Sequence, residues 1–181
     1  MTSYQEAIKE YEHTDDSGQH KTIYAYFGLA VYYAQCIEEM YIAMLYTRRI
    51  AKLKTKTQQN AREIIEKIDS SRNTMGRFIG EVKQAYSLTD ELEKSLKAIL
   101  ETRNFLVHKY FKRNVQKFSS DVGRREMLQY FCDFIEDAKK LEEQLLPYHE
   151  KYLHRLGISD DLITLGMQHQ QSEERKRDQN C

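Results

Sequence analysis

The sequence predicts an all-α protein, an up-and-down bundle of four main helices with short extra helices. The 181 residues include one proline and seven glycines, and so few breaking residues do not suit a β-sandwich, which needs many turns. Apolar residues recur every three or four positions in four segments, as they do on one face of a helix. Hydrophobic residues make up 40% of the chain and charged residues 31%. This composition allows one hydrophobic core with charged outer faces.

The first main helix is predicted over residues 22–54, after a short helix at 2–12 and a loop of breaking residues at 14–18. Six tyrosines fall between positions 24 and 46, and such a stripe favours packing in a core or an interface, because tyrosine adds a large area with one polar tip. The inward stripe is Phe27, Val31, Ala34, Glu38, Tyr41 and Leu45.

The second and third main helices are predicted over 75–86 and 89–110, after a mixed loop and short helix at 55–72. Hydroxyl cap candidates and acids at 87–91 indicate the start of the third helix. The second helix presents Met75, Phe78, Ile79, Val82 and Tyr86 inward, and the third presents Leu92, Leu96, Ile99, Arg103, Leu106 and Tyr110.

The fourth main helix is predicted over 122–147, after a connection at 112–121, and Pro147 should end or bend it. Ser159 begins another N-cap pattern, which predicts a short helical stretch. Residues 1–166 are therefore expected to form one helical-bundle domain. Residues 167–181 are expected to form a flexible polar tail. The inward stripe of the fourth helix is Leu128, Phe131, Ile135, Ala138, Leu141 and Leu145.

Several classes of protein lack support in the sequence. No glycine-rich phosphate-binding motif is present, no apolar run is long enough to cross a membrane, and the first ten residues carry no secretory signal. The three cysteines are odd in number and scattered, without the spacing of a disulfide framework or a zinc site. We therefore expect a protein of the reducing cytoplasm that contacts no membrane and needs no metal or other cofactor.

Charge is balanced over the whole chain but not locally. Lysine plus arginine equals aspartate plus glutamate, at 28 each. Residues 101–125 hold seven bases and two acids, residues 126–150 hold seven acids and two lysines, and residues 48–56 hold five bases and no acid. These clusters are either ordinary solvated faces or local anion-binding surfaces, such as one for an RNA backbone.

Two charged residues interrupt the apolar stripes, namely Arg103 and Glu38, and a buried charge needs a partner or a functional reason. They form either a structural pair inside the bundle or part of a cleft or subunit interface. His108 follows Arg103 by five positions, so the two lie about 140° apart around the helix axis. Asn104 and His108, four apart, share one face. A site that uses both Arg103 and His108 therefore needs a wide cleft, a helix end near His108, or a second subunit.

The string Arg103-Asn104-x-x-x-His108, followed by Tyr110, resembles the R-x(4–6)-H signature of HEPN domains (higher eukaryotes and prokaryotes nucleotide-binding). HEPN domains are helical bundles of about this size, with the motif late in the third core helix or at its junction. The resemblance implies a metal-independent endoribonuclease, a toxin or an effector of antiviral defence, whose product ends in a 2′,3′-cyclic phosphate.

The same resemblance implies roles for individual residues. Arg103 would hold the scissile phosphate, His108 would transfer protons, and Asn104 would orient the site. Glu38 would support the site or lie at a subunit interface. RNA-binding residues would be Lys109, Tyr110, Lys112 and Arg113.

The family also implies partners. Its members typically form homodimers in which two motifs face one cleft, and the helices that carry Glu38 and Arg103 are the candidate dimer face. Many act with another protein, such as an antitoxin or a component of a defence system. Two alternatives stay open: a HEPN-type binding or assembly module that does not cleave RNA, and an unrelated bundle in which Arg103 and His108 are structural.

Overall fold

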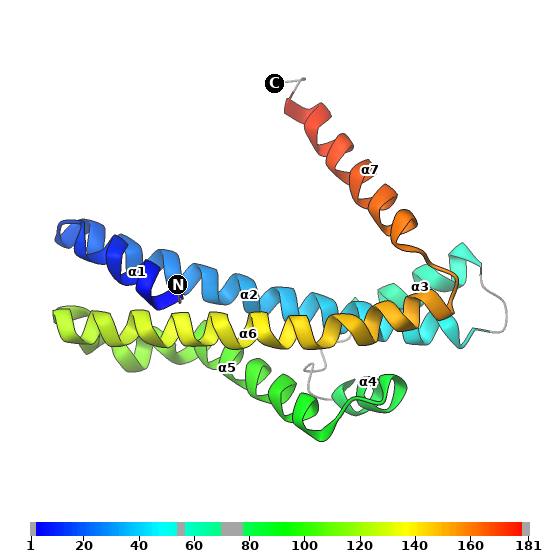
Figure 1. Ribbon diagram of the computed structural model, residues 1–181, viewed down its shortest axis with the longest axis horizontal. Coiled ribbons are helices and arrows are strands. Elements are labelled where there is room, and N and C mark those ends of the chain that lie inside the picture. The colour runs from blue at the N-terminus through cyan, green and yellow to red at the C-terminus, as the bar shows by residue number, and fades with distance from the viewer. Residues whose placement is uncertain (1–2, 54–56, 70–77, 179–181) are drawn as a thin grey trace.

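The computed structural model describes residues 3–53, 57–69 and 78–178, in which helices joined by short turns are the regular structure and no β-strand occurs (Figure 1). The predicted all-α class is therefore confirmed. In chain order the elements are α1 (Ser3–Glu12), α2 (Asp16–Ala51), α3 (Gln58–Asp69), α4 (Ile79–Tyr86), α5 (Asp90–Asn114), the 3-10 helix η2 (Val115–Ser119), α6 (Asp121–Arg155) and α7 (Asp160–Asp178).

Helix α2 begins six residues before the predicted start at residue 22. The Asp15 side chain accepts a hydrogen bond from the Gly18 backbone N–H at 2.8 Å and thereby caps the helix. The breaking residues of the predicted loop are thus the cap and first turn of α2. The predicted inward stripe is correct in part: Ala34, Tyr41 and Leu45 are buried, whereas its other members, Phe27, Val31 and Glu38, are half-buried. The fully buried side chains of α2 also include three that the stripe did not contain, Ile23, Ile37 and Met44.

Helix α5 begins where the sequence predicted. The Thr89 hydroxyl accepts a hydrogen bond from the Leu92 N–H at 3.2 Å, and three acidic residues occupy the first turn. The helix runs on to Asn114 and passes into η2, so most of the predicted connection at 112–121 is helical. Met75 of the predicted second helix lies outside the described residues, but Ile79, Val82 and Tyr86 are buried on α4 as expected.

Pro147 does not end α6, which continues to Arg155. A proline inside a helix removes one N–H donor and frees the carbonyl four residues earlier, here that of Glu143. Both Pro147 and Glu143 are exposed, so water can hydrogen-bond the freed carbonyl and the helix tolerates the proline.

The end of α6 is a Schellman motif around Gly157, whose φ of 77° suits glycine. The Ile158 N–H donates to the Leu153 carbonyl at 3.1 Å, and the Gly157 N–H donates to the His154 carbonyl at 3.0 Å. These two bonds satisfy carbonyls that the helix end would leave without partners.

Helix α7 projects away from the other helices (Figure 1). The predicted helical stretch after Ser159 is present, and the predicted polar tail is helical as far as Asp178. The predicted end of the domain at residue 166 stays a prediction. Every α7 side chain that the structure describes is exposed. The flexibility of this segment stays a prediction.

Helices α2 and α6 lie side by side and run parallel, since the start of α2 meets the start of α6 and their ends also meet. Helix α5 runs antiparallel to α2, because Glu38 pairs with Arg103 while Tyr24, nearer the start of α2, packs on Phe111, nearer the end of α5. Helix α4 also runs antiparallel to α2, with the Glu81 side chain on Arg49 and the Tyr86 hydroxyl on the Met44 carbonyl. Helices α4 and α5 therefore run in the same direction as each other, both opposite to α2. Consecutive helices of an up-and-down bundle alternate in direction, so the predicted connectivity is wrong between α4 and α5.

Arg124 connects the N-terminal elements to the start of α6. Its side chain is 11% exposed and donates to the Tyr11 hydroxyl at 2.8 Å, the Phe118 carbonyl at 3.1 Å and the Gln19 side-chain oxygen at 3.1 Å. The buried residues of all these helices form one continuous core. None of the helices described is long and apolar enough to cross a membrane.

Candidate functional site

Arg103 and Glu38 form an ion pair within one chain, one of the two arrangements that the sequence left open. A terminal guanidinium nitrogen of Arg103 lies 2.6 Å from Glu38 Oε2. The Arg103 side chain is 28% exposed and the Glu38 side chain 17%. The pair therefore joins α5 to α2 at the edge of the core, partly shielded from water.

Asn104 extends this pair toward the surface. The second terminal nitrogen of Arg103 donates to Asn104 Oδ1 at 3.0 Å, while Arg103 Nε is buried and has no hydrogen-bond partner among the described residues. Both terminal nitrogens of the guanidinium are thus engaged, one with a carboxylate and one with an amide. A phosphate that reached Arg103 would have to replace or share these contacts.

His108 lies on the surface of α5, one turn after Asn104. It is exposed, and no hydrogen bond or ion pair joins it to another residue in the described part of the chain. It lies well inside α5, which ends at Asn114, so no helix end brings it toward Arg103. Asn104 is instead the link, because it accepts from Arg103 and shares a face with His108, about 6 Å along the axis.

The surface around His108 is partly apolar. Val107 is 43% exposed and Tyr24 of α2 is 56% exposed. Tyr24 packs against Phe111, with ring centroids 5.9 Å apart, and Phe111 lies one turn from both Val107 and His108 on α5. We call this surface, formed by Tyr24, Asn104, Val107, His108 and Phe111, the α2/α5 face.

Four residues were predicted to bind RNA, and three of them lie on the surface of α5. Lys112 is four residues after His108 and extends the α2/α5 face. Lys109 and Arg113, also four apart, form a second exposed row, in which the Arg113 guanidinium carbon lies 5.9 Å from the centre of the Phe105 ring. Lys112 is therefore the predicted RNA-binding cation that shares a row with His108.

Tyr110, the fourth predicted RNA-binding residue, belongs to the core. It is 3% exposed, and its ring stacks on that of Tyr130 at 5.1 Å and packs against Phe131 at 4.8 Å. Burial raises the pKa of its phenol well above the usual range. An RNA base could reach this ring only if the core opened, so the prediction that Tyr110 binds RNA is corrected.

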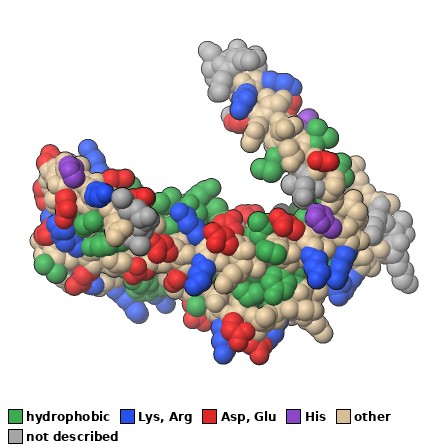
Figure 2. Space-filling view, in the orientation of Figure 1, with side chains coloured by type: hydrophobic (Ala, Val, Ile, Leu, Met, Phe, Trp, Pro, Cys, Tyr) green, Lys and Arg blue, Asp and Glu red, His purple; other side chains and the backbone are tan. Residues whose placement is uncertain are grey.

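Most other cations of the two basic segments take part in contacts within the chain. Lys117 pairs with Glu126 at 2.7 Å. Arg124 donates to groups of α1 and α2, and Arg125 pairs with an acid of α1 and with Asp121. Arg49 donates two hydrogen bonds to Glu81, of 2.9 and 3.2 Å. Lys54 and Lys56 lie outside the described residues. Figure 2 shows acidic and basic side chains intermixed rather than gathered in one patch.

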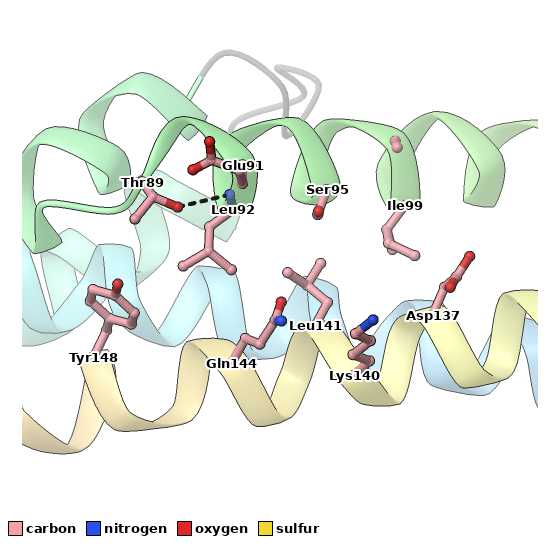
Figure 3. Close-up of a pocket in the computed structure, with 11 residues that line it drawn as sticks. Thr89, Glu91, Leu92, Ser95, Ile99, Asp137, Lys140, Leu141, Gln144 and Tyr148 are labelled. Carbon is pink, nitrogen blue, oxygen red and sulfur yellow. Dashed lines mark hydrogen bonds between the residues drawn. The ribbon is translucent and has the colours of Figure 1, made fainter.

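A groove between α5 and α6 was not predicted from the sequence. It has a volume of about 520 Å³ and lies beside the first half of α5, away from His108 (Figure 3). Leu92 and Ile99 line one side, and Leu141, Gln144 and Tyr148 line the other. The groove depends on the angle between two helices, which their separate hydrophobic stripes do not specify. No group of three or more histidine, cysteine or acidic residues in the described ranges is placed to hold a metal ion.

No family model matches this chain, and no curated protein sequence or solved structure matches it either. The likeness to HEPN domains therefore rests on the string from Arg103 to His108 and on the all-helical fold.

Proposed function

We propose that the α2/α5 face binds RNA and cleaves it as HEPN ribonucleases do, without a metal ion. The observation that supports this proposal is the chain of contacts from Glu38 through Arg103 to Asn104, which ends one turn from an exposed His108. A cation, a polar amide and an imidazole thereby lie along one surface, with Lys112 extending it.

The reaction needs only groups that RNA and this surface supply. His108, as a general base, would take the proton of a ribose 2′-hydroxyl, and the 2′-oxygen would attack the adjacent phosphorus. The bond from phosphorus to the 5′-oxygen of the next nucleotide would break, and that oxygen would take up a proton from water, while the His108 imidazolium would return its own proton to solvent. The products are a 2′,3′-cyclic phosphate and a 5′-hydroxyl. Arg103 would stabilise the charge on the phosphate oxygens once it is released from Asn104.

The ion pair with Glu38 sets a condition on this activity. While Glu38 neutralises Arg103, the affinity of the site for phosphate is lowered. A second copy of the chain, docked on the apolar part of the α2/α5 face, would supply a second motif and exclude water from the cleft. An antitoxin would act by covering the same face. We place the protein in the cytoplasm, as a toxin or an effector of antiviral defence.

A second candidate function is favoured by the same ion pair. If Arg103 serves only to hold α5 on α2, the α2/α5 face is a binding or assembly surface for a partner protein, and no RNA is cut.

The test is to incubate the protein in EDTA with a mixture of tRNA and single-stranded RNA. The natural chain is compared with Arg103→Ala, His108→Ala and Glu38→Gln, and Lys94→Ala, an exposed cation elsewhere on α5, is the matched control. We expect fragments ending in cyclic phosphate from the natural chain and the control, and a loss of about a hundredfold or more in the first two variants. Glu38→Gln should raise the rate, because it removes the charge that competes with phosphate.

The other outcomes separate the two functions. If the natural chain is dimeric, folded and inactive on every RNA, the proposal of cleavage fails and the binding module is favoured. Equal activity in the natural chain and in His108→Ala would mean that the nuclease, if present, does not use this motif.

A further inference from the structure

A hollow between the end of α4 and the end of α6 is not used by the proposed function. Its volume is about 430 Å³, which lies within the range of sites that bind small molecules. His108 comes eighteen residues after Asp90, the first residue of α5, and thus about 27 Å along the helix axis. The α2/α5 face is therefore well separated from this hollow. The polar and aromatic residues that line the α4/α6 hollow are Tyr86, Ser87, Tyr148, Lys151, Tyr152 and Arg155.

Two cations of α6 line the hollow and have no partner in the described part of the chain. Lys151 and Arg155 are four residues apart, so they share one face of the helix. Both are exposed, and no hydrogen bond or ion pair joins either side chain to another described residue. A cation in the last turn of a helix offsets the helix dipole, which accounts for Arg155 but not for Lys151, one turn earlier. Among the residues described, no aspartate or glutamate lines this hollow.

Arg48 of α2 adds a third positive charge next to the hollow. One terminal nitrogen of its guanidinium donates to the Tyr152 hydroxyl at 3.3 Å, while Nε is buried and has no hydrogen-bond partner among the described residues. No carboxylate of the described ranges pairs with this side chain. A partly shielded cation without an acidic partner is unfavourable, so an anion bound near Tyr152 would balance part of its charge.

Tyrosine rings supply flat surface in the same hollow. The rings of Tyr86 and Tyr152 lie 4.6 Å apart between centroids, and the Tyr86 hydroxyl donates to the Met44 carbonyl at 2.9 Å. These contacts hold the two rings in place before any ligand arrives. Tyr148 is half-buried, and Figure 3 shows it pointing from α6 toward the start of α5. A planar ligand could pack against these rings.

Ser87 has a backbone conformation that serine rarely adopts. Its φ is 55°, and it is the one residue other than glycine with a positive φ among those described. Glycine is the usual residue at such a helix end, because it takes this conformation without strain. The Ser87 backbone N–H donates to the Lys83 carbonyl and caps α4, which a glycine would do equally well. The hydroxyl of Ser87 is not needed for the cap, and it lines the hollow.

We propose that the α4/α6 hollow binds a phosphate monoester of a planar ring. Lys151 and Arg155 hold the phosphate, Tyr148 and Tyr152 contact the ring, and the Ser87 hydroxyl bonds a polar atom of the ligand. A phosphate monoester carries about 1.5 to 2 negative charges near neutral pH, which matches two neighbouring cations better than the single charge of a carboxylate does. This inference is independent of the proposed ribonuclease.

The test is isothermal titration calorimetry of the natural chain with five named compounds. AMP and phenyl phosphate carry both the ring and the phosphate monoester. Adenosine has the ring alone, inorganic phosphate has the anion alone, and benzoate has a ring with a single charge. We expect one or both of the two esters to bind about tenfold or more tightly than the other three compounds. Tighter binding of AMP would indicate a nucleotide as the ligand, and tighter binding of phenyl phosphate would indicate a simpler aromatic ester.

Variants test which side chains hold the ester. Lys151→Ala and Arg155→Ala should each weaken binding about tenfold, because a charge-assisted hydrogen bond is lost. Tyr148→Leu should also weaken it, since leucine keeps an apolar side chain but has no ring. Glu150 lines an adjoining hollow that shares Lys151 and Arg155, so Glu150→Gln should strengthen binding. The matched control is Lys94→Ala, an exposed cation on α5, which should leave binding unchanged.

Ser87→Gly separates a binding role from a structural one. Glycine relieves the strained backbone, so Tm should rise, while loss of the hydroxyl should weaken binding about threefold. A rise in Tm with unchanged binding would refute the role of Ser87. The whole proposal would be overturned if the folded natural chain bound neither ester at millimolar concentration. It would also be overturned if adenosine or inorganic phosphate bound as tightly as the esters, or if Lys151→Ala and Arg155→Ala both bound them like the natural chain.

Discussion

The ion pair between Arg103 and Glu38 allows a quantitative test of how far the motif is structural. Exposed ion pairs contribute about 0.2–1 kcal/mol, and removing one partner of a fully buried pair costs about 3–5 kcal/mol. With side chains 28% and 17% exposed, this pair lies between the two limits. We expect Arg103→Ala to lower the free energy of unfolding by about 2 kcal/mol, because it leaves a shielded carboxylate without its cation and removes the packing of the arginine stem.

Glu38→Ala should cost less, about 1 kcal/mol, since the long Arg103 side chain can turn toward water and keep its bond to Asn104. In a protein of this size, 1 kcal/mol corresponds to about 2–4 °C in Tm, so Arg103→Ala should lower Tm by about 4–8 °C. The double variant should show a coupling energy of about 1 kcal/mol. Urea unfolding of the four chains measures all of these quantities.

The matched control is the pair of Lys97 and Glu93 on the same helix, in which the lysine side chain is 52% exposed. Replacing Lys97 by alanine should change stability by no more than about 0.5 kcal/mol. If the coupling between Arg103 and Glu38 is no larger than this control effect, the pair contributes nothing special to the bundle. The structural explanation of Arg103 would then be refuted, and a functional reason for the pair would be needed.

Two further predictions concern stability. An added Cβ at Gly123 would lie 2.3 Å from the Lys117 carbonyl oxygen, whereas one at Gly28 would meet no atom within 4 Å. We therefore expect Gly123→Ala to destabilise the protein by about 2 kcal/mol and Gly28→Ala to stabilise it by about 0.5–1 kcal/mol. Thermal unfolding in which the two variants change Tm in the same direction would contradict this. Burial lowers the pKa of His149 below its usual 6.5, so the unfolded chain binds the proton more readily and this contribution to stability, present above pH 6.5, is lost as pH falls below it. Urea unfolding at pH 7.5 and 5.5 should show a smaller pH dependence in His149→Gln than in the natural chain, and equal dependence would mean that His149 is not the group responsible.

The sequence predicted the helices well where a local signal marked them. The inward stripe of α5 and its start at Thr89 follow from residue spacing and from a hydroxyl cap, both of which act within a few residues. The predicted end of the fourth helix at Pro147 was wrong, because a proline on the exposed side of a long helix disturbs only one hydrogen bond, which water can replace. The direction of α4 relative to α5 could not be predicted, since it depends on contacts of Glu81 and Tyr86 with a helix about forty residues earlier.

The candidate site was predicted in part. Two charges on apolar stripes indicated that Arg103 and Glu38 form either a structural pair or part of a cleft or interface, and the structure contains the pair. Tyr110 had conflicting predictions, one as a member of the inward stripe of its helix and one as an RNA-binding residue, and its burial agrees with the first. The groove between α5 and α6 could be seen only once the angle between these two helices was known.

The contacts of Arg124 have a consequence for the order in which the chain can fold during synthesis. The N-terminal helix α1 meets the start of α6 through Tyr11, and the Ser3 backbone N–H donates to Glu136 at 2.8 Å, more than a hundred residues later. A ribosome adds about 5–20 residues each second, so α1 emerges many seconds before its partners exist. During that interval the apolar side of α1 and the matching side of α2 have no α6 to cover them. We therefore infer that the nascent chain is most prone to aggregate before Glu136 has left the ribosome, and that α1 is made early but docks late.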